Sequence, residues 1–230
     1  MLLSNIITYV IATCTKYGID ESHGLSHSLN TLYYANRIYE REVIHRGYIR
    51  PQERLIYVSA AIHDMCDKKY VDEATGISDI YNYISKIQRN PLNKSPLLYQ
   101  YEVDAVGKII STMSYSKVKK HGFPNLAEFQ TAYHIVRESD LLSGYDFDRS
   151  MVYHMYNTNS TLDQAYHNAR ELFNNRVLKQ IDDKLFFTEY ARDTAPVLHK
   201  QSIERMEHWN HILTKPTRGY TDPRSLPRLY

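Results

Sequence analysis

Cysteine is scarce in this chain. Only Cys14 and Cys66 occur in 230 residues, and they do not form a CxxC pair. Small secreted scaffolds need several disulfides, and thiolate zinc sites need clustered cysteines. We therefore exclude both classes and expect a protein of a reduced, cytoplasmic setting.

Glycine and proline are also few, with eight of each in the whole chain. An all-β fold needs many turns, and these two residues supply most of them. Apolar residues instead recur every three or four positions over long stretches, which is the helical period. The sequence predicts an all-α chain with one helical domain over residues 1–215 and an irregular tail over 216–230, where prolines cluster.

A strong excess of one charge is absent as well. The chain has 28 Lys and Arg against 26 Asp and Glu, a net charge of +2. A duplex-binding surface is typically far more basic, so nucleic acid is not an expected partner. The apolar start of the chain is interrupted by Ser4, Asn5 and Thr8 and is too short to span a bilayer. We interpret it as a core helix and expect no membrane partner.

Helix boundaries follow from the apolar period, from glycine and proline, and from capping residues. Gly18 is expected to end the first helix, and Ser22 or Ser26 to cap the second. The charged segment 67–76 and the polar segment 114–125 are predicted to be loops, with a break at 90–93. Helices are predicted over about 2–17, 26–45, 51–67, 77–87, 97–113, 127–142, 161–176 and 195–213.

The dipeptide His63-Asp64 ends the buried helical run AAIHD. Polar groups at a core boundary are costly unless each has a partner. Taken alone, a hydrogen-bonded pair that closes the helix explains the dipeptide better than a metal ion does. Two further residues change this balance: His27 lies early in one predicted helix and Asp140 late in another, so three helices could converge on one ion.

Four segments occur in a fixed order along the chain: HGLSH, HDMCDKKY, SYSKVKKHGFPN and IVRESDLL. Together they resemble the motifs of the HD-domain metal-dependent phosphohydrolases, a family with a helical core, a histidine, a His-Asp pair and a distant aspartate. The resemblance covers about residues 22–144. It implies an HD-domain helical bundle with additional C-terminal helices and one divalent ion held by His27, His63, Asp64 and Asp140.

The resemblance also implies a chemistry. A mixed nitrogen and oxygen ligand set suits Mn²⁺, Fe²⁺, Co²⁺, Ni²⁺ or Mg²⁺, and such an ion activates water against a phosphoryl group. The expected substrate is a small-molecule phosphate ester, with hydrolysis of a phosphate or pyrophosphate bond of a nucleotide. The expected catalytic residues are Asp64, Asp67 and Lys68, and the expected substrate-binding residues are His23, Lys117, Lys120 and Arg137.

Several of these residues have a second interpretation. His23 competes with His27 as the first ligand, Asp67 could cap a helix, and the lysines of 117–120 could form a solvated cluster. The chain also departs from the family pattern. Asn30 stands where relatives commonly carry arginine, and Met113 where many carry histidine. These departures leave the metal ligands intact but affect the phosphate contacts and the choice of substrate.

Two other functions stay open at this point. The chain could be a non-catalytic HD protein that binds a metal ion or a nucleotide. It could also be a di-iron oxygenase, a class with this motif and two extra histidines. His121 and His134 lie between Asp64 and Asp140, but neither matches the additional ligand pattern.

Overall fold

The structure is a computed structural model that describes residues 2–89 and 96–215. Within these ranges the chain forms helices and no strand, which confirms the predicted all-α class. The expected break at 90–93 and the expected tail over 216–230 lie outside the described residues. The α-helices are α1 (Leu2–Tyr17), α2 (Leu25–His45), α3 (Glu53–Ile62), α4 (Glu73–Gln88), α5 (Gln100–Thr112), α6 (Tyr115–His121), α7 (Gln130–Ser143), α8 (Phe147–Asn157), α9 (Leu162–Asn175) and α10 (Glu189–Thr214). The 3₁₀ helices are η1 (Gly47–Gln52), η2 (Ala127–Phe129) and η3 (Val177–Lys179).

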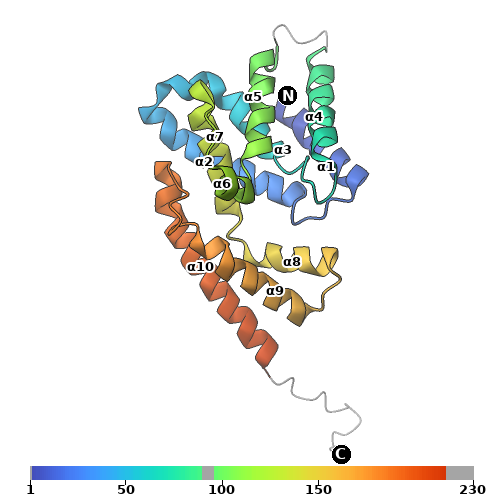
Figure 1. Ribbon diagram of the computed structural model, residues 1–230, viewed down its shortest axis with the longest axis vertical. Helices are drawn as coiled ribbons and strands as arrows, with labels where there is room; N and C mark the ends of the chain where they lie inside the picture. The colour runs from blue at the N-terminus through green and yellow to red at the C-terminus, as the bar shows by residue number, and fades with distance from the viewer. Residues whose placement is uncertain (1, 90–95, 216–230) are drawn as a thin grey trace, which may run out of the picture.

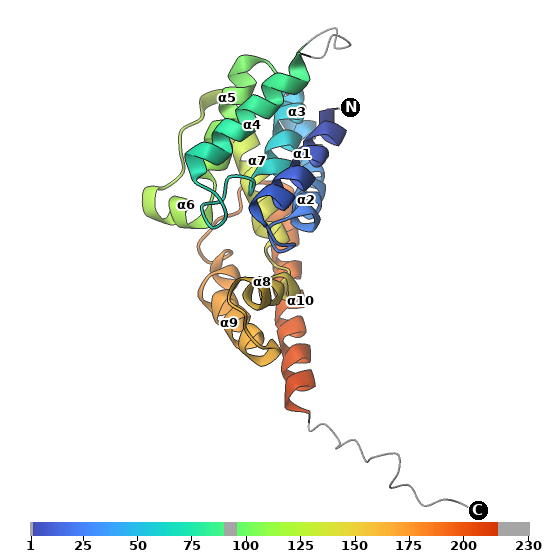
Figure 2. The same ribbon diagram turned by 90° about the vertical axis from the view of Figure 1, so that its right-hand side faces the viewer.

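Helices α1 to α7 form a bundle in the upper part of Figure 1, and α8 and α9 pack against each other below it. Helix α10 runs beside both parts, as the turned view in Figure 2 shows, and contacts α2, α7, α8 and α9. The buried apolar side chains nevertheless form one continuous cluster that reaches from Ile6 to Met206.

Helix α3 lies at the centre of the upper bundle and packs against α1, α2, α5 and α7. Its apolar side chains are buried on every face, as expected for a helix surrounded by others. Full burial of a side chain such as Leu55 stabilises the fold by roughly 1.5–3 kcal/mol. The chain leaves this helix directly into His63 and Asp64, so a helix packed between four others positions that pair.

Two glycines define the turn between α1 and α2. Gly18 adopts φ +64° after α1, the left-handed conformation that favours glycine at a helix end. A Cβ on Gly24 would lie 2.9 Å from the carbonyl oxygen of Asp20. Gly24 is the N-cap residue of α2 and has no side chain to cap it, and the amide of Ser26 instead donates to Glu21 Oε2 at 3.2 Å. The expected cap at Ser22 or Ser26 is therefore wrong, and a close backbone approach starts the helix two residues before His27.

Three helix predictions need correction. The segment expected to be a loop at 114–125 contains α6, because the Ser114 hydroxyl accepts a hydrogen bond from the amide of Lys117. Helix α8 was not predicted, and the side chain of Asp146 caps it by accepting from the amide of Arg149 at 3.1 Å. Helix α10 begins before its expected start at 195 and continues through Pro196.

Two more boundaries differ from the expectation. The segment expected to be a loop at 67–76 already contains the start of α4, where the Asp72 side chain accepts from the amide of Thr75 at 3.0 Å. The third predicted helix is shorter than expected: η1 holds Pro51, and α3 ends at Ile62. His63 therefore lies at the C-terminal cap of α3 and not inside a longer helix.

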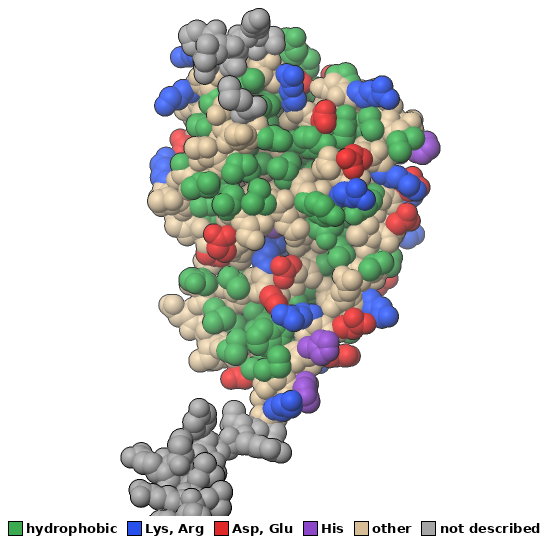
Figure 3. Space-filling view, turned by 180° about the vertical axis from the view of Figure 1, so that it is seen from behind, with side chains coloured by type: hydrophobic (Ala, Val, Ile, Leu, Met, Phe, Trp, Pro, Cys, Tyr) green, Lys and Arg blue, Asp and Glu red, His purple; other side chains and the backbone are tan. Residues whose placement is uncertain are grey.

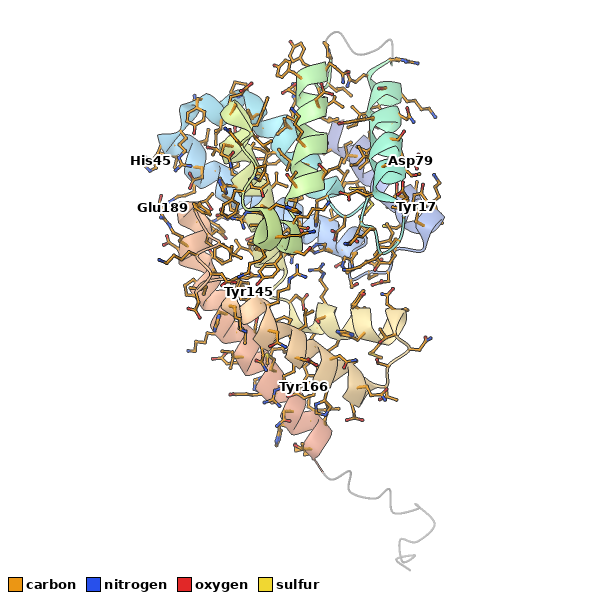
Figure 4. The ribbon with its side chains drawn as sticks, viewed as in Figure 1. Tyr17, His45, Asp79, Tyr145, Tyr166 and Glu189 are labelled. Atoms are coloured by element: carbon orange, nitrogen blue, oxygen red, sulfur yellow. The ribbon has the colours of Figure 1, made fainter. Side chains whose placement is uncertain are left out.

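Polar contacts join helices that are distant in sequence (Figure 4). The Tyr17 hydroxyl donates to Asp79 Oδ2 at 2.6 Å, which ties α1 to α4. At the start of α10, the amide of Glu189 donates to Glu42 Oε1 at 2.8 Å, and Arg41 donates to Glu189 Oε1 at 2.6 Å. These contacts fix the upper end of α10 on α2.

The surface carries charges of both signs. Figure 3 shows Lys and Arg side chains interspersed with Asp and Glu over the face seen from behind, in agreement with the net charge of +2. Among the described helices, none combines the length and the apolar character needed to cross a bilayer.

Candidate metal centre

Four side chains from three helical elements meet at one point. His27 belongs to the first turn of α2, His63 and Asp64 follow α3, and Asp140 lies near the C-terminal end of α7. The Nε2 atoms of His27 and His63 are 3.1 Å apart. Asp64 places Oδ2 3.3 Å from His27 Nε2 and Oδ1 3.4 Å from His63 Nε2. Asp140 Oδ1 lies 3.3 Å and 3.4 Å from the same two nitrogens. The structure thus brings together the four residues that the motifs implied.

Neighbouring groups orient both imidazoles. His63 Nδ1 lies 2.9 Å from the carbonyl oxygen of Ala60, to which it donates. The Ser143 hydroxyl donates to the Asp140 carbonyl at 2.9 Å, so it accepts from His27 Nδ1 at 3.3 Å. When Nδ1 carries the proton, Nε2 of each ring has a lone pair directed at the cluster. Such hydrogen bonds commonly set the tautomer of metal-binding histidines.

The donor set fits a divalent cation. Ligand atoms of His27, His63 and Asp64 all lie within 4.8 Å of one another. Atoms bound about 2.0–2.2 Å from one ion stand roughly 3 to 3.5 Å apart, which matches the distances in the cluster. Asp64 Oδ2 is buried and has no hydrogen-bond partner among the described residues, as expected of an atom suited to bind a cation. The cluster could therefore hold a metal ion, and its donor atoms do not distinguish between candidate metals.

The charges of the cluster act on one another. Burial alone would lower the pKa of His63, but the carboxylates of Asp64 and Asp140 outweigh it and raise that pKa well above its usual value. Burial would likewise raise the pKa of both carboxyls, yet His63 holds them well below their usual range. A proton and a cation thus compete for the same nitrogen, so metal binding should release protons.

A cavity of about 620 Å³ opens at the cluster. This volume falls within the range of roughly 300–1,000 Å³ that is typical of small-molecule sites. Asp64, Asp67, Asp140 and His23 line one side. The opposite side is a wall built from α8, α9 and η3. The candidate metal centre therefore faces a space large enough for an organic ligand.

His23 lines the cavity beside the cluster. Its Nε2 lies 2.9 Å from Lys69 Nζ, and its Nδ1 lies 2.7 Å from the hydroxyl of Ser22. Because the ammonium can only donate, Nε2 accepts and Nδ1 carries the proton. Burial lowers the pKa of His23 to about 3, so the ring stays neutral. Both nitrogens are occupied by these contacts, which places His23 next to the metal ligands and not among them.

The structure does not bring four of the expected substrate or catalytic cations to the cavity. Lys68 and Lys120 are exposed and outside its lining. Lys117 pairs with Glu73, because helix α6 turns its side chain towards α4. Arg137 is only 2% exposed and donates to Glu138 and to the Leu185 carbonyl. The structure thus places none of these four side chains in the lining of the cavity.

Three other cations line the cavity: Lys69, Arg149 and Arg176. Arg149 Nε donates to the carbonyl of Ser22, and its guanidinium comes within 4.0 Å of Asp64 Oδ2. The guanidinium of Arg176 lies 4.7 Å from the centre of the Tyr115 ring. Lys69 adjoins the expected Lys68 in the motif, so the sequence located this cation to within one residue. Arg149 and Arg176 lie beyond the motifs, and no sequence signal marked them.

The two extra histidines of the oxygenase alternative lie away from the cluster. His121 is exposed at the end of α6. His134 packs between Phe123 and Phe187, with ring centres 5.5 Å and 4.6 Å away. Within residues 2–89 and 96–215, the cluster at His27 is the one group of metal-ligating side chains with suitable spacing. The positions of His121 and His134 thus give no support to a second metal ion.

Comparison of the chain with protein-family models, with curated proteins and with solved structures finds no match. Any functional assignment therefore depends on the motifs and on the geometry of the site.

Proposed function

We propose that this chain is a metal-dependent phosphohydrolase of the HD-domain type that acts on a small nucleotide in the cytoplasm. One observation carries the proposal: two oriented imidazoles and two carboxylates surround one point, and that point faces a cavity lined by three cations. Phosphoryl transfer needs a cation centre and positive charge around the transferred group. The site has four side chains suited to bind the cation and three cationic side chains beside them.

His27, His63, Asp64 and Asp140 would hold one divalent ion. Mn²⁺, Fe²⁺, Co²⁺, Ni²⁺ and Mg²⁺ all accept such a mixed donor set to different degrees. When bound, the ion would polarise a phosphoryl oxygen and make a water molecule nucleophilic at neutral pH.

The cations of the cavity bind the substrate anion. The Arg149 guanidinium can donate two parallel hydrogen bonds to phosphoryl oxygens, and its contact with Ser22 fixes its direction. Lys69 supplies a second positive charge and takes the role that the motif had suggested for Lys68. Both groups neutralise charge that develops on the phosphoryl oxygens, which lowers the barrier to hydrolysis.

Asp67 supplies a carboxylate at the same edge of the cavity. Its Oδ1 accepts from the amide of Lys69 at 2.9 Å, and its Oδ2 lies 3.7 Å from Lys69 Nζ. These contacts hold the carboxylate in place and still leave it at the cavity surface. Asp67 can therefore accept a proton from water or return one to the leaving group.

A hydrolysis screen tests the proposal. Purified protein is assayed for phosphate and pyrophosphate release from nucleoside mono-, di- and triphosphates with Mn²⁺ or Co²⁺, next to Asp64→Ala and the exposed control Asp163→Ala. We expect release by the wild type and the control, and a loss of at least about 100-fold in Asp64→Ala. Metal and nucleotide binding without turnover would instead indicate a non-catalytic binding protein, and inactivity without binding would contradict both.

A further inference from the structure

The far wall of the cavity is built by a part of the chain that the motifs do not cover. Helix α8 contributes Ser150 and His154, and Gln180 follows η3. Ser150 and His154 stand four residues apart and so share one face of α8. These residues line the same cavity as Asp64 and Asp140, so a ligand that fills the cavity contacts them.

Three residues of this wall, Ser150, His154 and Gln180, have side-chain atoms without a hydrogen-bond partner among the described residues. Gln180 is 2% exposed and Ser150 is 8% exposed, yet Gln180 Oε1 and Ser150 Oγ are both unpaired. Both ring nitrogens of His154 are unpaired as well. A buried polar group without a partner costs about 1–3 kcal/mol, and such groups in native proteins generally meet a ligand, an ion or water.

The lack of a hydrogen-bond partner is not by itself sufficient to identify a ligand site. Gln52 Oε1 and Ser59 Oγ are also buried and unpaired, but neither residue lines the cavity. Ser143 and Ser202, on neighbouring helices, satisfy their hydroxyls by donating to a carbonyl three or four residues earlier. Ser150 does not make this bond. Of the buried unpaired groups in the described chain, those of Ser150, His154 and Gln180 lie on this wall, where a ligand in the cavity can reach them.

We propose that this wall binds the organic half of the substrate, and that this half is a nucleoside held by hydrogen bonds to Gln180 and Ser150. The inference rests on the proposed function, which directs the phosphoryl group to Arg149 and the metal ligands. It adds a second, separate subsite that binds the nucleoside part of the substrate, which is not hydrolysed.

The chemistry of the wall selects the ligand class. The amide of Gln180 offers a donor and an acceptor side by side, which complements the edge of a nucleobase, and the Ser150 hydroxyl can do either. An alkyl or aryl ester would leave these groups unpaired. A site built to hydrogen-bond its ligand discriminates strongly against analogues that lack the matching groups. The wall therefore favours nucleosides over simple alcohols.

Direct binding of non-hydrolysable probes tests this subsite. The probes are the 5′-methylenephosphonates of adenosine, guanosine, cytidine and uridine, with methylphosphonate as the headgroup alone, in equilibrium dialysis with Mn²⁺. We expect the tightest nucleoside probe to bind at least about tenfold more tightly than methylphosphonate. Gln180→Met and Ser150→Ala should each weaken that probe at least about fivefold and leave methylphosphonate within about twofold.

Matched controls are Gln52→Met and Ser59→Ala, which replace the unpaired groups outside the cavity and should bind as the wild type does. Thermal unfolding checks that each variant is folded, and Ser150→Ala carries the test alone if Gln180→Met is not. The inference is overturned if no nucleoside probe binds better than methylphosphonate, or if the wall variants weaken both probes equally.

The result separates this inference from the proposed function. Nucleoside selectivity that depends on Gln180, in a protein that hydrolyses no nucleotide, supports the subsite and contradicts the hydrolase. Hydrolysis of phosphate esters with no preference for nucleosides supports the hydrolase and contradicts the subsite.

Discussion

The guanidinium of Arg149 lies 4.0 Å from Oδ2 of Asp64, although the two residues belong to α8 and to the turn after α3. This contact is where the wall formed by α8, α9 and η3 meets the candidate metal centre. The Arg149 side chain is 20% exposed, and its Nε is held by the Ser22 carbonyl. Arg149 is thus directed at the candidate metal centre.

Replacing Arg149 should impair catalysis and spare metal binding. We expect Arg149→Ala to lower kcat/KM for a nucleotide about 10- to 100-fold, since one charge-assisted contact to the transition state is lost. Arg149→Lys should recover only part of the activity, because lysine lacks the planar fork. Steady-state kinetics and elemental analysis measure both effects. Arg170→Ala, an exposed arginine on α9, is the control, and unchanged kinetics in Arg149→Ala would contradict the role.

Replacing Arg137 should lower the stability of the fold and leave catalysis unchanged. Its guanidinium is buried against Glu138 and the rings of Phe123 and Phe187. Removal of one partner from a buried ion pair costs about 3–5 kcal/mol, so the free energy of unfolding of Arg137→Met should fall by about that amount. Urea titration measures the change. At a temperature where the variant is folded, kcat/KM should stay within about twofold of wild type. A loss of activity without a loss of stability would restore Arg137 as a substrate contact.

The metal content of two variants should show that His63 is a ligand and that His23 is not. His63→Ala removes an Nε2 of the cluster, so we expect it to lose at least about tenfold in Mn²⁺ affinity. His23→Ala should keep its metal, because both nitrogens of His23 contact Ser22 and Lys69. Calorimetric titration and elemental analysis of the purified variants test this. Equal metal loss in both variants would make His23 a ligand.

Chelation should lower the unfolding temperature of the wild type, since an ion that binds only the folded chain stabilises it. A metal at 100 times its dissociation constant contributes about 2.7 kcal/mol. His63→Ala should show no such shift. A wild-type protein whose unfolding temperature does not respond to chelator would contradict a metal site.

His134 predicts a pH dependence of stability. Burial between Phe123 and Phe187 lowers the pKa of His134 to about 4. As pH falls from the unfolded pKa of about 6.5 towards 4, the unfolded chain binds a proton that the folded chain does not. Stability is therefore lost over this window, by at most about 3 kcal/mol for a ring that is 15% exposed.

The variant His134→Phe tests this dependence. Because phenylalanine takes up no proton, the variant should lose less free energy of unfolding between about pH 7 and pH 4.5 than the wild type does. The exposed His208→Gln serves as the control for the other titrating groups. Equal losses in wild type and His134→Phe would show that folding does not shift the pKa of His134.

Much of the fold follows from local patterns. Helix α1 was predicted with its end at Gly18, because its apolar period and its left-handed glycine agree. Helix α6 was missed because it has only seven residues, and its sequence of lysines carries almost no apolar period. Its start depends on one hydroxyl, that of Ser114. In a polar stretch, a serine can begin a helix or form a turn, and the sequence does not distinguish the two.

The site was predictable where local motifs define it. His27 and Asp140 lie within predicted helices and His63 and Asp64 directly after α3, and the resemblance of their segments to the HD-domain motifs implied that the four converge. The cations were not predictable in the same way. Arg149 lies in the first turn of α8, and this helix, which brings the guanidinium to Asp64, was not predicted. Lys117 was expected at the substrate, but its segment forms a helix instead of a loop, and its side chain pairs with Glu73.

Helix α10 joins the upper bundle to the part formed by α8 and α9. Its 26 residues extend for about 39 Å and contact α2 and α7 as well as α8 and α9. Ser202 on this helix donates to the carbonyl of Tyr145 at 2.6 Å, at the junction between α7 and α8. One continuous helix therefore contacts elements from both parts that line the cavity. Its buried residues Ala191, Ala195 and Met206 belong to the continuous apolar cluster, so a change of their volume would disturb the packing of both parts at once.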